Sequence, residues 1–231
     1  MAAMGGSPLY LVISLGLPRT TSFSSVKSFF RGVESAVNPF KVKLVGGDTV
    51  RSQRVVADTC VIGVVRAGGV LRRMGAKPGD LIFATGAFGY SFSTGWHYLF
   101  QPRIKEMEFL KKRMKITSAI DASDGLYASL RTLSRESRVF FRIDASKIRF
   151  RKKQRSFRAS FEAALFDGED FELVFTGRCW NFDRLSEQFQ KSFQVPLSVI
   201  GRVEAGQGMR FIDKEGWNIH VRAREFQHFK K

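Results

Sequence analysis

The chain has 231 residues, 44% of them hydrophobic, so it is long and apolar enough to bury a core, which excludes a disordered protein. Its two cysteines, Cys60 and Cys179, belong to no CxxC or Cys/His cluster, which excludes a disulfide framework and a cysteine-based zinc site and favours a reducing, cytoplasmic compartment. The net charge of +17 favours an anionic partner, whether nucleic acid, acidic lipid or a phosphorylated metabolite.

The first third of the chain alternates apolar runs of strand and helix type. Residues 8–17 are β-favouring and predict a core strand. This run is about half a membrane span and follows no basic segment, so we expect neither a signal peptide nor a membrane anchor. Apolar positions at helical spacing predict a helix over 24–38, which Pro39 ends. Strands are expected to follow at 41–45 and 55–65.

Beyond residue 67 the alternation continues, and glycine-containing turns separate the elements. The expected helices, read from apolar spacing, are 68–74, 91–100, 126–138, 157–166 and 185–193. The expected strands are 81–85, 139–143, 171–176, 199–204, 209–212 and 217–221, the last three pairing antiparallel. The order predicts an α/β protein of two domains, an α+β domain over 1–67 and an α/β domain over 68–231, with the phenylalanines in the core.

Three tight turns place acids beside glycine, which is unexpected in so basic a chain. They are Gly46-Gly47-Asp48-Thr49, Asp121-Ala122-Ser123-Asp124-Gly125 and Asp167-Gly168-Glu169-Asp170. Glycine lets backbone N–H groups approach phosphate oxygens, and neighbouring carboxylates can hold Mg²⁺, which prefers oxygen ligands. Each turn alone is better explained by ordinary turn formation or helix capping. Together the three turns indicate a magnesium–phosphate site.

Two basic runs raise the alternative of a nucleic-acid-binding protein. They are residues 111–115 and 149–155, and the second contains Phe150, an aromatic that could stack on a base. The basic residues are nevertheless spread along the whole chain, and no zinc finger, helix-turn-helix or aromatic RNA-binding signature accompanies them. We therefore expect solvated surfaces and no specific binding of nucleic acid.

Seven short strings follow one another along the chain. They are AAMGG at 2–6, LVGGDTVR at 44–51, RMGAKPGD at 73–80, TG at 85–86, DASDGL at 121–126, GEDFEL at 168–173 and FQHF at 226–229. In this order and spacing they resemble the thiamine-monophosphate kinase family, within the superfamily of aminoimidazole ribonucleotide synthetase. The resemblance covers nearly the whole chain. It implies ATP-dependent phosphorylation of thiamine monophosphate to thiamine diphosphate, by direct metal-assisted transfer without a catalytic nucleophile.

The resemblance also implies a role for each residue that matches a family motif. The implied Mg²⁺ ligands are Asp48, Asp121 and Asp124. The implied contacts to ATP are Gly47, Asp48, Arg73 and Ser123, and the implied contacts to thiamine monophosphate are Glu169 and Phe226. By the same resemblance, residues 1–67 are the remainder of an incomplete N-terminal ATP- and magnesium-binding domain, and 68–231 form a C-terminal α/β domain of the aminoimidazole ribonucleotide synthetase type.

The resemblance departs from the family at the start of the chain. Family members carry a further β-rich segment before the position equivalent to Met1, with a Gly-Asp-Asp motif and another metal-binding aspartate. We therefore expect residues 1–231 alone to have little or no kinase activity, and a homodimer to need the complete N-terminal domain. The alternative function is that of a catalytically inactive relative that binds a ligand or a partner protein.

Overall fold

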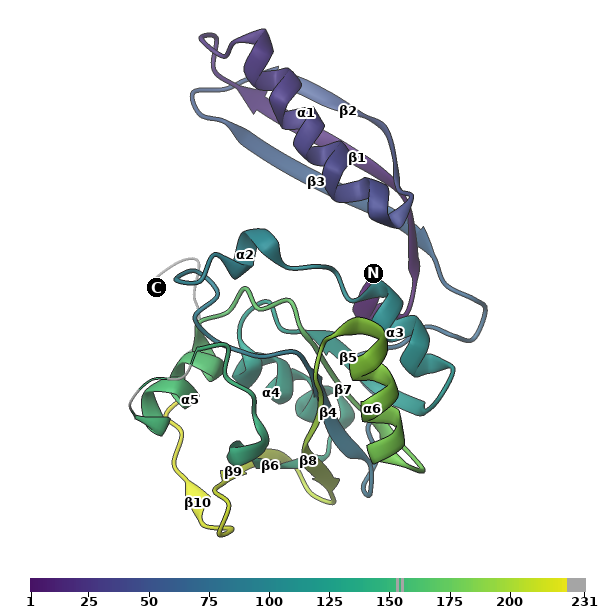
Figure 1. Cartoon of the computed structure of the whole chain (residues 1–231), viewed down its shortest axis with the longest axis vertical. Helices are drawn as coiled ribbons and strands as arrows, with labels where there is room; N and C mark the ends of the chain where they lie inside the picture. Colours follow the sequence, from purple (N-terminus) through teal and green to yellow (C-terminus); the bar gives the residue numbers. More distant parts are fainter. Residues whose placement is uncertain (153, 155, 224–231) are drawn as a thin grey trace. The chain divides into compact units, whose positions relative to one another are not determined.

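The computed structural model describes residues 1–152, 154 and 156–223, which form two compact units (Figure 1). Unit 1 contains Met1 and Gly6–Gly69, and unit 2 contains Ala2–Gly5 and the described residues from Val70 onward. In this part of the chain, no helix has the length and apolar character needed to cross a membrane.

The described residues of unit 1 form a three-stranded sheet with one helix on one face (Figure 1). The central strand β1 (Ser7–Leu17) pairs parallel with β2 (Lys43–Arg51) and antiparallel with β3 (Val56–Val64). Helix α1 (Phe23–Val37) is followed by a short 3-10 turn, η2 (Asn38–Phe40). Alternate residues of β1 face α1, and the cluster that they form comprises Leu11, Ile13 and Leu15 with Phe29, Phe30, Val33 and Val37.

The string Gly46-Gly47-Asp48-Thr49 lies inside β2, so the predicted turn at 46–49 was wrong. Pairing with β1 continues through both glycines, from Val12 opposite Gly46 to Leu15 opposite Thr49. At Gly47 a β-carbon would lie 1.7 Å from the carbonyl oxygen of Ile13, so only glycine allows β1 and β2 to pair this closely.

Unit 2 has, among its described residues, a seven-stranded sheet in the order β10-β9-β6-β8-β4-β7-β5, with helices packed on it. Its strands are β4 (Leu81–Thr85), β5 (Lys115–Asp121), β6 (Phe140–Asp144), β7 (Leu173–Arg178), β8 (Leu197–Glu204), β9 (Gly208–Ile212) and β10 (Asn218–Ile219). Its helices are η1 (Ala2–Met4), α2 (Trp96–Leu99), α3 (Ile104–Lys111), α4 (Leu126–Ser137), η3 (Ala145–Lys147), α5 (Phe157–Phe166) and α6 (Phe182–Phe193). The mixed α/β class predicted from the sequence is confirmed.

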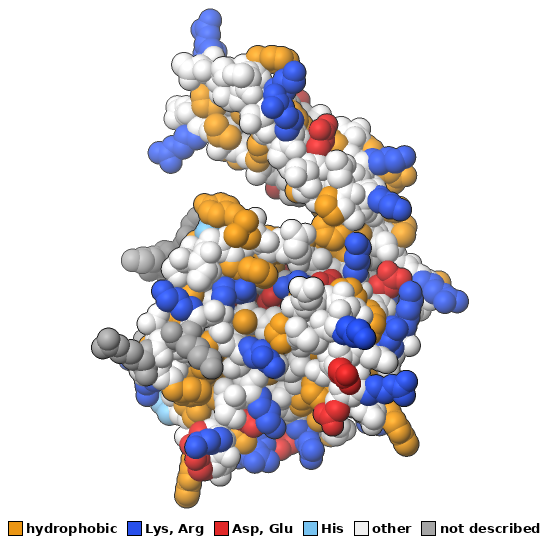
Figure 2. Space-filling model, viewed as in Figure 1, with side chains coloured by type: hydrophobic (Ala, Val, Ile, Leu, Met, Phe, Trp, Pro, Cys, Tyr) orange, Lys and Arg blue, Asp and Glu red, His pale blue; other side chains and the backbone are white. Residues whose placement is uncertain are grey.

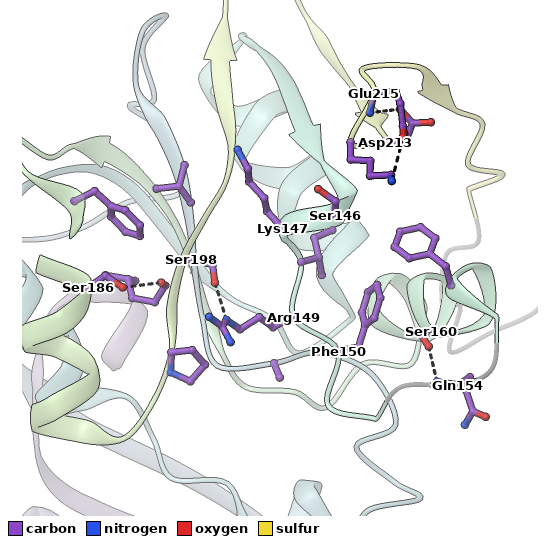
Figure 3. Close-up of a pocket in the computed structure, with 18 residues that line it drawn as sticks. Ser146, Lys147, Arg149, Phe150, Gln154, Ser160, Ser186, Ser198, Asp213 and Glu215 are labelled. Carbon is purple, nitrogen blue, oxygen red and sulfur yellow. Dashed lines mark hydrogen bonds and ion pairs between the residues drawn. The ribbon is translucent and has the colours of Figure 1, made fainter. Parts of the chain in front are cut away.

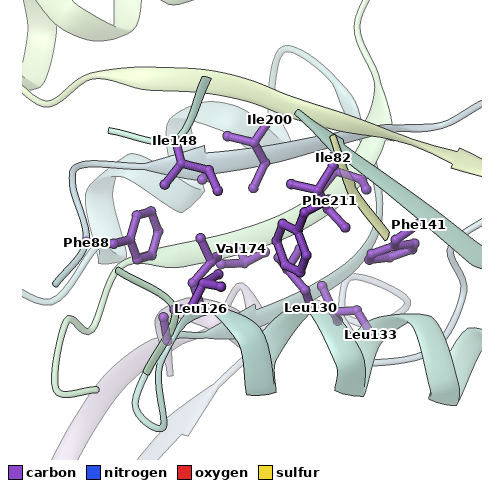
Figure 4. Packing of buried hydrophobic residues seen from close by; sticks show 14 of the residues in the cluster. Ile82, Phe88, Leu126, Leu130, Leu133, Phe141, Ile148, Val174, Ile200 and Phe211 are labelled. Atoms are coloured by element: carbon purple, nitrogen blue, oxygen red, sulfur yellow. The ribbon is translucent and has the colours of Figure 1, made fainter. Parts of the chain in front are cut away.

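Two apolar cores hold this sheet to its helices. In the first, Leu126, Leu130 and Leu133 of α4 form the buried stripe that their spacing predicts, and they pack against strand residues such as Phe141 (Figure 4). In the second, Phe83 of β4 and its cross-strand neighbours pack against α3 and α6. Among the described residues, the predicted core role of the phenylalanines holds in part, since Phe23 and Phe92 are exposed. Those that are fully buried are Phe83, Phe88, Phe141, Phe175 and Phe189.

Several predicted elements of unit 2 differ in the structure. Residues 68–74 are not helical, because their backbone bonds to other segments: Leu71 N donates to Met4 O, and Ala119 N of β5 donates to Arg72 O. The helix predicted over 91–100 is reduced to α2. Residues 91–95 form turns instead, and Gly95, directly before α2, has a left-handed backbone conformation. Helix α3 and strand β5 were not predicted.

The three last strands do not form one antiparallel ribbon. Strand β6 lies between β8 and β9, pairing antiparallel with β8 and parallel with β9. The predicted pairing of β8 with β9 was therefore wrong. Only β9 and β10 pair antiparallel as expected.

Candidate functional site

Two of the three acidic strings meet at one end of the sheet in unit 2. Asp121 ends β5, and the string 121–125 leads into α4, while the string 167–170 joins α5 to β7. The two loops bond backbone to backbone: Glu169 N donates to Ser123 O over 2.7 Å, and Phe171 N donates to Ala122 O over 2.9 Å. The structure therefore brings four predicted site residues together from two distant parts of the chain: Asp121, Ser123, Asp124 and Glu169.

Glycines permit this close approach. Gly125 and Gly168 both have positive φ, 90° and 71°. A β-carbon on Gly168 would lie 2.8 Å from Ser123 O, and one on Gly125 would lie 2.5 Å from Leu165 O. Either side chain would push the loops apart, which explains why both strings contain glycine at these positions.

The acids at this junction have no partner for their carboxylates. Asp121 and Glu169 are half-buried and Asp124 is exposed. Across the described residues, none of the three carboxylates accepts a hydrogen bond or forms an ion pair. In a protein with a net charge of +17, these three acids are therefore not neutralised by basic side chains among the described residues.

Two acids of the string GEDFEL at 168–173, Asp170 and Glu172, differ from Glu169 because they are buried and their carboxylates have partners. Asp170 is 0% exposed and accepts hydrogen bonds from Ser91 Oγ at 2.6 Å, Gly89 N at 3.0 Å and Arg151 Nη2 at 3.1 Å. Burial raises the pKa of Asp170, and these donors oppose that rise by stabilising the carboxylate. Asp170 therefore ties the glycine loop after β4 to the string 167–170.

Glu172 forms a buried ion pair with Arg103. Arg103 Nε and Nη2 donate to its two carboxylate oxygens over 2.8 and 2.6 Å, and Thr85 Oγ1 donates over 2.8 Å. Arg103 Nη1 also donates to Glu106 over 3.3 Å. Burial alone lowers the pKa of Arg103, but the hydrogen bonds and charges of Glu172 and Glu106 raise it above its ordinary value.

An aromatic side chain completes this network. Trp96 Nε1 donates to the backbone oxygen of Asp170 over 2.8 Å, and the guanidinium of Arg151 lies 4.0 Å from the Trp96 ring centroid. Phe100 stacks on Phe171 at 4.2 Å between centroids. The segment between β4 and α3 is thus packed onto the string that positions Glu169.

Sequence reasoning missed this network, although one signal was present. Asp170 and Glu172 directly precede β7, a strand whose apolar residues Leu173, Val174 and Phe175 predict burial on both faces, so acids next to it are expected to need partners. The partners Arg103 and Arg151 carry no comparable signal, because they come from other parts of the chain.

The remaining predicted site residues lie elsewhere. Arg73 is exposed, in the segment that bonds to β5 through Arg72 O. Gly47 and Asp48 belong to β2 of unit 1, where Asp48 Oδ1 accepts from Thr49 N over 2.8 Å. Phe226 lies outside the described residues. Within residues 1–152, 154 and 156–223, no three side chains among His, Cys, Asp and Glu are arranged to hold a metal ion.

The basic runs are largely engaged within the protein. Arg151 binds Asp170 and the carbonyl of Ala87, and Phe150 packs on Phe157 rather than standing free. In the run 111–115, Lys112 pairs with Glu108 over 2.7 Å and the Arg113 guanidinium lies 3.6 Å from the Phe109 ring centroid. Neither run presents an aromatic platform for bases.

Comparison with known proteins gives a consistent set of similarities. The model of the family "AIR synthase related protein, N-terminal domain" matches residues 1–65. The thiamine-monophosphate kinase of Pyrococcus horikoshii is 34% identical over 229 residues, covering 93% of this chain and 71% of that protein. That of Methanospirillum hungatei is 31% identical over 232 residues, covering 95% of this chain and 77% of that protein.

Solved structures of thiamine-monophosphate kinases resemble this chain as well. Thiamine-monophosphate kinase from Stenotrophomonas maltophilia superposes with a TM-score of 0.79 at 28% identity, covering 91% of this chain and 73% of that one. The structure of AaThiL complexed with AMPPCP and TMP has a TM-score of 0.76 at 27% identity, covering 99% of this chain and 76% of that one.

Proposed function

The chain belongs to the thiamine-monophosphate kinase family, and from this membership we propose that it transfers the γ-phosphoryl group of ATP to thiamine monophosphate, producing thiamine diphosphate. The observation that supports this most directly is the meeting of the strings 121–125 and 167–170, which gathers three unpartnered carboxylates at two glycine-dependent loops. Phosphoryl transfer needs positioning and charge neutralisation more than a protein nucleophile. Carboxylates that can hold a metal ion are therefore the type of group that this reaction requires.

We assign the metal and nucleotide contacts as follows. In unit 2, Asp121 and Asp124 hold Mg²⁺, and Ser123 and Arg73 contact ATP. The motif in unit 1 assigns Asp48 as a metal ligand and Gly47 as an ATP contact. Two free carboxylates on one loop fit Mg²⁺, which proteins usually bind through one or two carboxylates plus phosphate oxygens of the substrate. When bound, the metal supplies neutralisation of phosphate charge. The exposed guanidinium of Arg73 offers further positive charge to the transferring group.

We assign Glu169 to thiamine monophosphate. Glu169 has a φ of 56°, a left-handed conformation that is uncommon for a residue with a side chain. The bond from Glu169 N to Ser123 O and the buried neighbour Asp170 hold it there. Its carboxylate, free of internal partners, suits the positive charge of a thiazolium ring. The contact of Phe226 with the same substrate stays a prediction from the motif.

Incubation of the purified chain with thiamine monophosphate and Mg-ATP tests the function. The proposed function predicts that thiamine diphosphate forms, against the expectation of little or no activity stated above, and that its formation stops when EDTA removes the metal. The product is detected by fluorescence after oxidation and chromatography. Calorimetric titration with thiamine monophosphate serves as the second readout. Binding of this substrate without turnover would identify a catalytically inactive relative, and absence of both would contradict the proposal.

Although the resemblance implies a homodimer only for a complete N-terminal domain, we propose that unit 1 itself pairs with a second copy of the chain through the sheet face opposite α1. Residues paired across strands share a face, so this face carries Tyr10 beside Ile62 and Gly16 between Val50 and Val56. It also carries Lys43, Asp48 and Asp58, so it is mixed rather than wholly apolar. Tyr10 and Ile62 are 42% and 49% exposed although both are large and apolar. A second copy presents the same face, and packing the two together would bury both.

Ile62→Asp is expected to convert a dimer into a monomer, because it places a charge beside Tyr10 in the apolar part of this face. Light scattering after size exclusion measures the mass, and circular dichroism checks that the variant folds. Phe23→Asp is the matched control, since Phe23 is 82% exposed at the start of α1, away from this face. A parent chain that is monomeric, or an Ile62→Asp variant that stays dimeric, would rule this interface out.

A cytoplasmic location completes the proposal. Cys60 and Cys179 are both free, and Cys60 is exposed, as expected of a protein in a reducing compartment.

A further inference from the structure

Three arginines form one row across neighbouring strands of unit 2. Arg142 of β6 lies opposite Arg202 of β8 on one side and opposite Arg210 of β9 on the other. Side chains of residues paired in this way point to the same face, with β-carbons about 5 Å apart. Phe141 and Ile143 face the core beneath α4, so the row lies on the other face of the sheet.

The acids near this row do not neutralise it. Glu204 is shared between Arg142 and Arg210, at 3.9 and 4.0 Å, the limit of an ion pair. In the part of the chain that the structure describes, the Arg202 side chain has neither a hydrogen bond nor an ion pair. Three arginines thus share one acid at long range, and like charges directly opposite each other destabilise a sheet, so the row keeps an excess of positive charge.

The row borders a hollow of about 320 Å³, which Arg142 and Arg202 line together with Lys147. Asp144 is the acid that lines it, and its carboxylate is engaged by Ser146 at 2.6 Å and Lys147 at 3.3 Å. Figure 2 shows Lys and Arg side chains, interspersed with acids, over the part of unit 2 where Figure 1 labels β6, β8 and β9. The hollow is therefore concave and positively charged.

A larger cleft of about 1180 Å³ continues from the hollow, and Lys147 and Val199 line both. Its wall includes Arg149, whose Nε donates to Ser198 Oγ over 3.2 Å, and the aromatic ring of Phe150 (Figure 3). A ligand anchored in the hollow could thus extend over an apolar and aromatic wall.

We propose that the hollow binds the oligophosphate group of a small molecule, with the Arg142–Arg202 pair and Lys147 as its cationic contacts. Guanidinium groups bind phosphate oxygens through paired hydrogen bonds, and two of them side by side match two linked phosphates better than a single carboxylate. The small volume of the hollow and the concentration of cations in one row favour a small ligand over a nucleic-acid strand.

This site is separate from the acidic loops. In the sheet order, β4 and β7 lie between β8 and β5, so Asp121 at the end of β5 is three strand spacings, about 14 Å, from β8. The proposal therefore does not rest on the kinase activity.

Calorimetric titration with sodium pyrophosphate, in EDTA and at constant ionic strength, tests the proposal on the whole chain. We expect the parent to bind, and Arg142→Gln/Arg202→Gln to weaken binding by roughly tenfold to hundredfold for each arginine. Arg158→Gln, which removes an exposed arginine of α5, is the matched control and should bind as the parent does. Asp121→Asn should also retain binding, which separates this site from the acidic loops.

Titrations with other anions show whether the ligand is a nucleotide, an isolated oligophosphate, any small anion or a nucleic acid. ADP binding that is tighter than pyrophosphate binding and is lost in Arg142→Gln/Arg202→Gln would identify a nucleotide whose body occupies the larger cleft. Equal affinity would identify the phosphates as the whole ligand. Equal responses to sulfate and pyrophosphate would show an adventitious ion only. A single-stranded oligonucleotide that binds more tightly with increasing length would overturn the proposal in favour of a nucleic-acid surface.

The unliganded protein offers a second readout. Because like charges oppose each other in the row, Arg142→Gln is expected to raise the Tm at low salt by about 1 to 3 °C. The increase should disappear at high salt or with pyrophosphate present. A lower Tm for Arg142→Gln at low salt would mean that Glu204 already neutralises the row, and would contradict the proposal.

Discussion

Asp121→Asn is expected to lower the rate of thiamine diphosphate formation by about a hundredfold or more and to weaken binding of Mg-AMPPCP at least about tenfold. Asparagine keeps the size and one oxygen of the side chain but loses the charge that would hold the metal. The Asp121 carboxylate has no bond to other described residues, so the fold should not depend on it. Calorimetry with Mg-AMPPCP measures the affinity, and thermal melting by circular dichroism measures the stability.

Glu187→Gln is the matched control for charge removal, because Glu187 is an exposed acid on α6 far along the chain from both acidic loops. It should leave affinity and rate unchanged. If Asp121→Asn binds Mg-AMPPCP as tightly as the parent, the string 121–125 does not hold the metal.

Arg103→Met is expected to destabilise the protein by about 3–5 kcal/mol, which lowers the Tm by roughly 10 °C. Arg103 and Glu172 are only 5% and 1% exposed and Glu106 is 8% exposed, so the change leaves the buried carboxylate of Glu172, and that of Glu106, without their cation. The cost comes from that uncompensated charge, rather than from the energy of the pair itself. Urea unfolding and thermal melting measure it.

A double variant separates the cost of an uncompensated buried charge from the energy of the ion pair itself. Arg103→Met/Glu172→Met removes both charges and should recover much of the lost stability, because an apolar pair of similar volume can replace a buried ion pair. Lys112→Met is the control, since it breaks the exposed Lys112–Glu108 pair, and should change stability little. Equal effects of Arg103→Met and Lys112→Met would show that the buried pair is not required.

Elements with a local pattern could be predicted from the sequence. The strand β1, the helix α1 and the leucine stripe of α4 follow from apolar periodicity and end signals within a few residues. Residues 46–49 show where such signals fail. Two glycines and an aspartate are typical of a turn, but pairing with β1, which is not a local property, extends them into a strand. The position of β6 between β8 and β9 is likewise a long-range pairing.

The acidic loops could be identified as motifs from their residues alone, and the same residues carried the resemblance to the kinase family. Their meeting depends on the antiparallel pairing of β5 with β7, which places Asp121 opposite Leu173. Within one string, Glu169 is left without a partner for its carboxylate among the described residues, whereas Asp170 and Glu172 are neutralised by Arg151 and Arg103. Local sequence was therefore enough to locate the acids. Only the folded chain separates those available to a ligand from those used for stability, because charge pairing depends on distance in space rather than along the sequence.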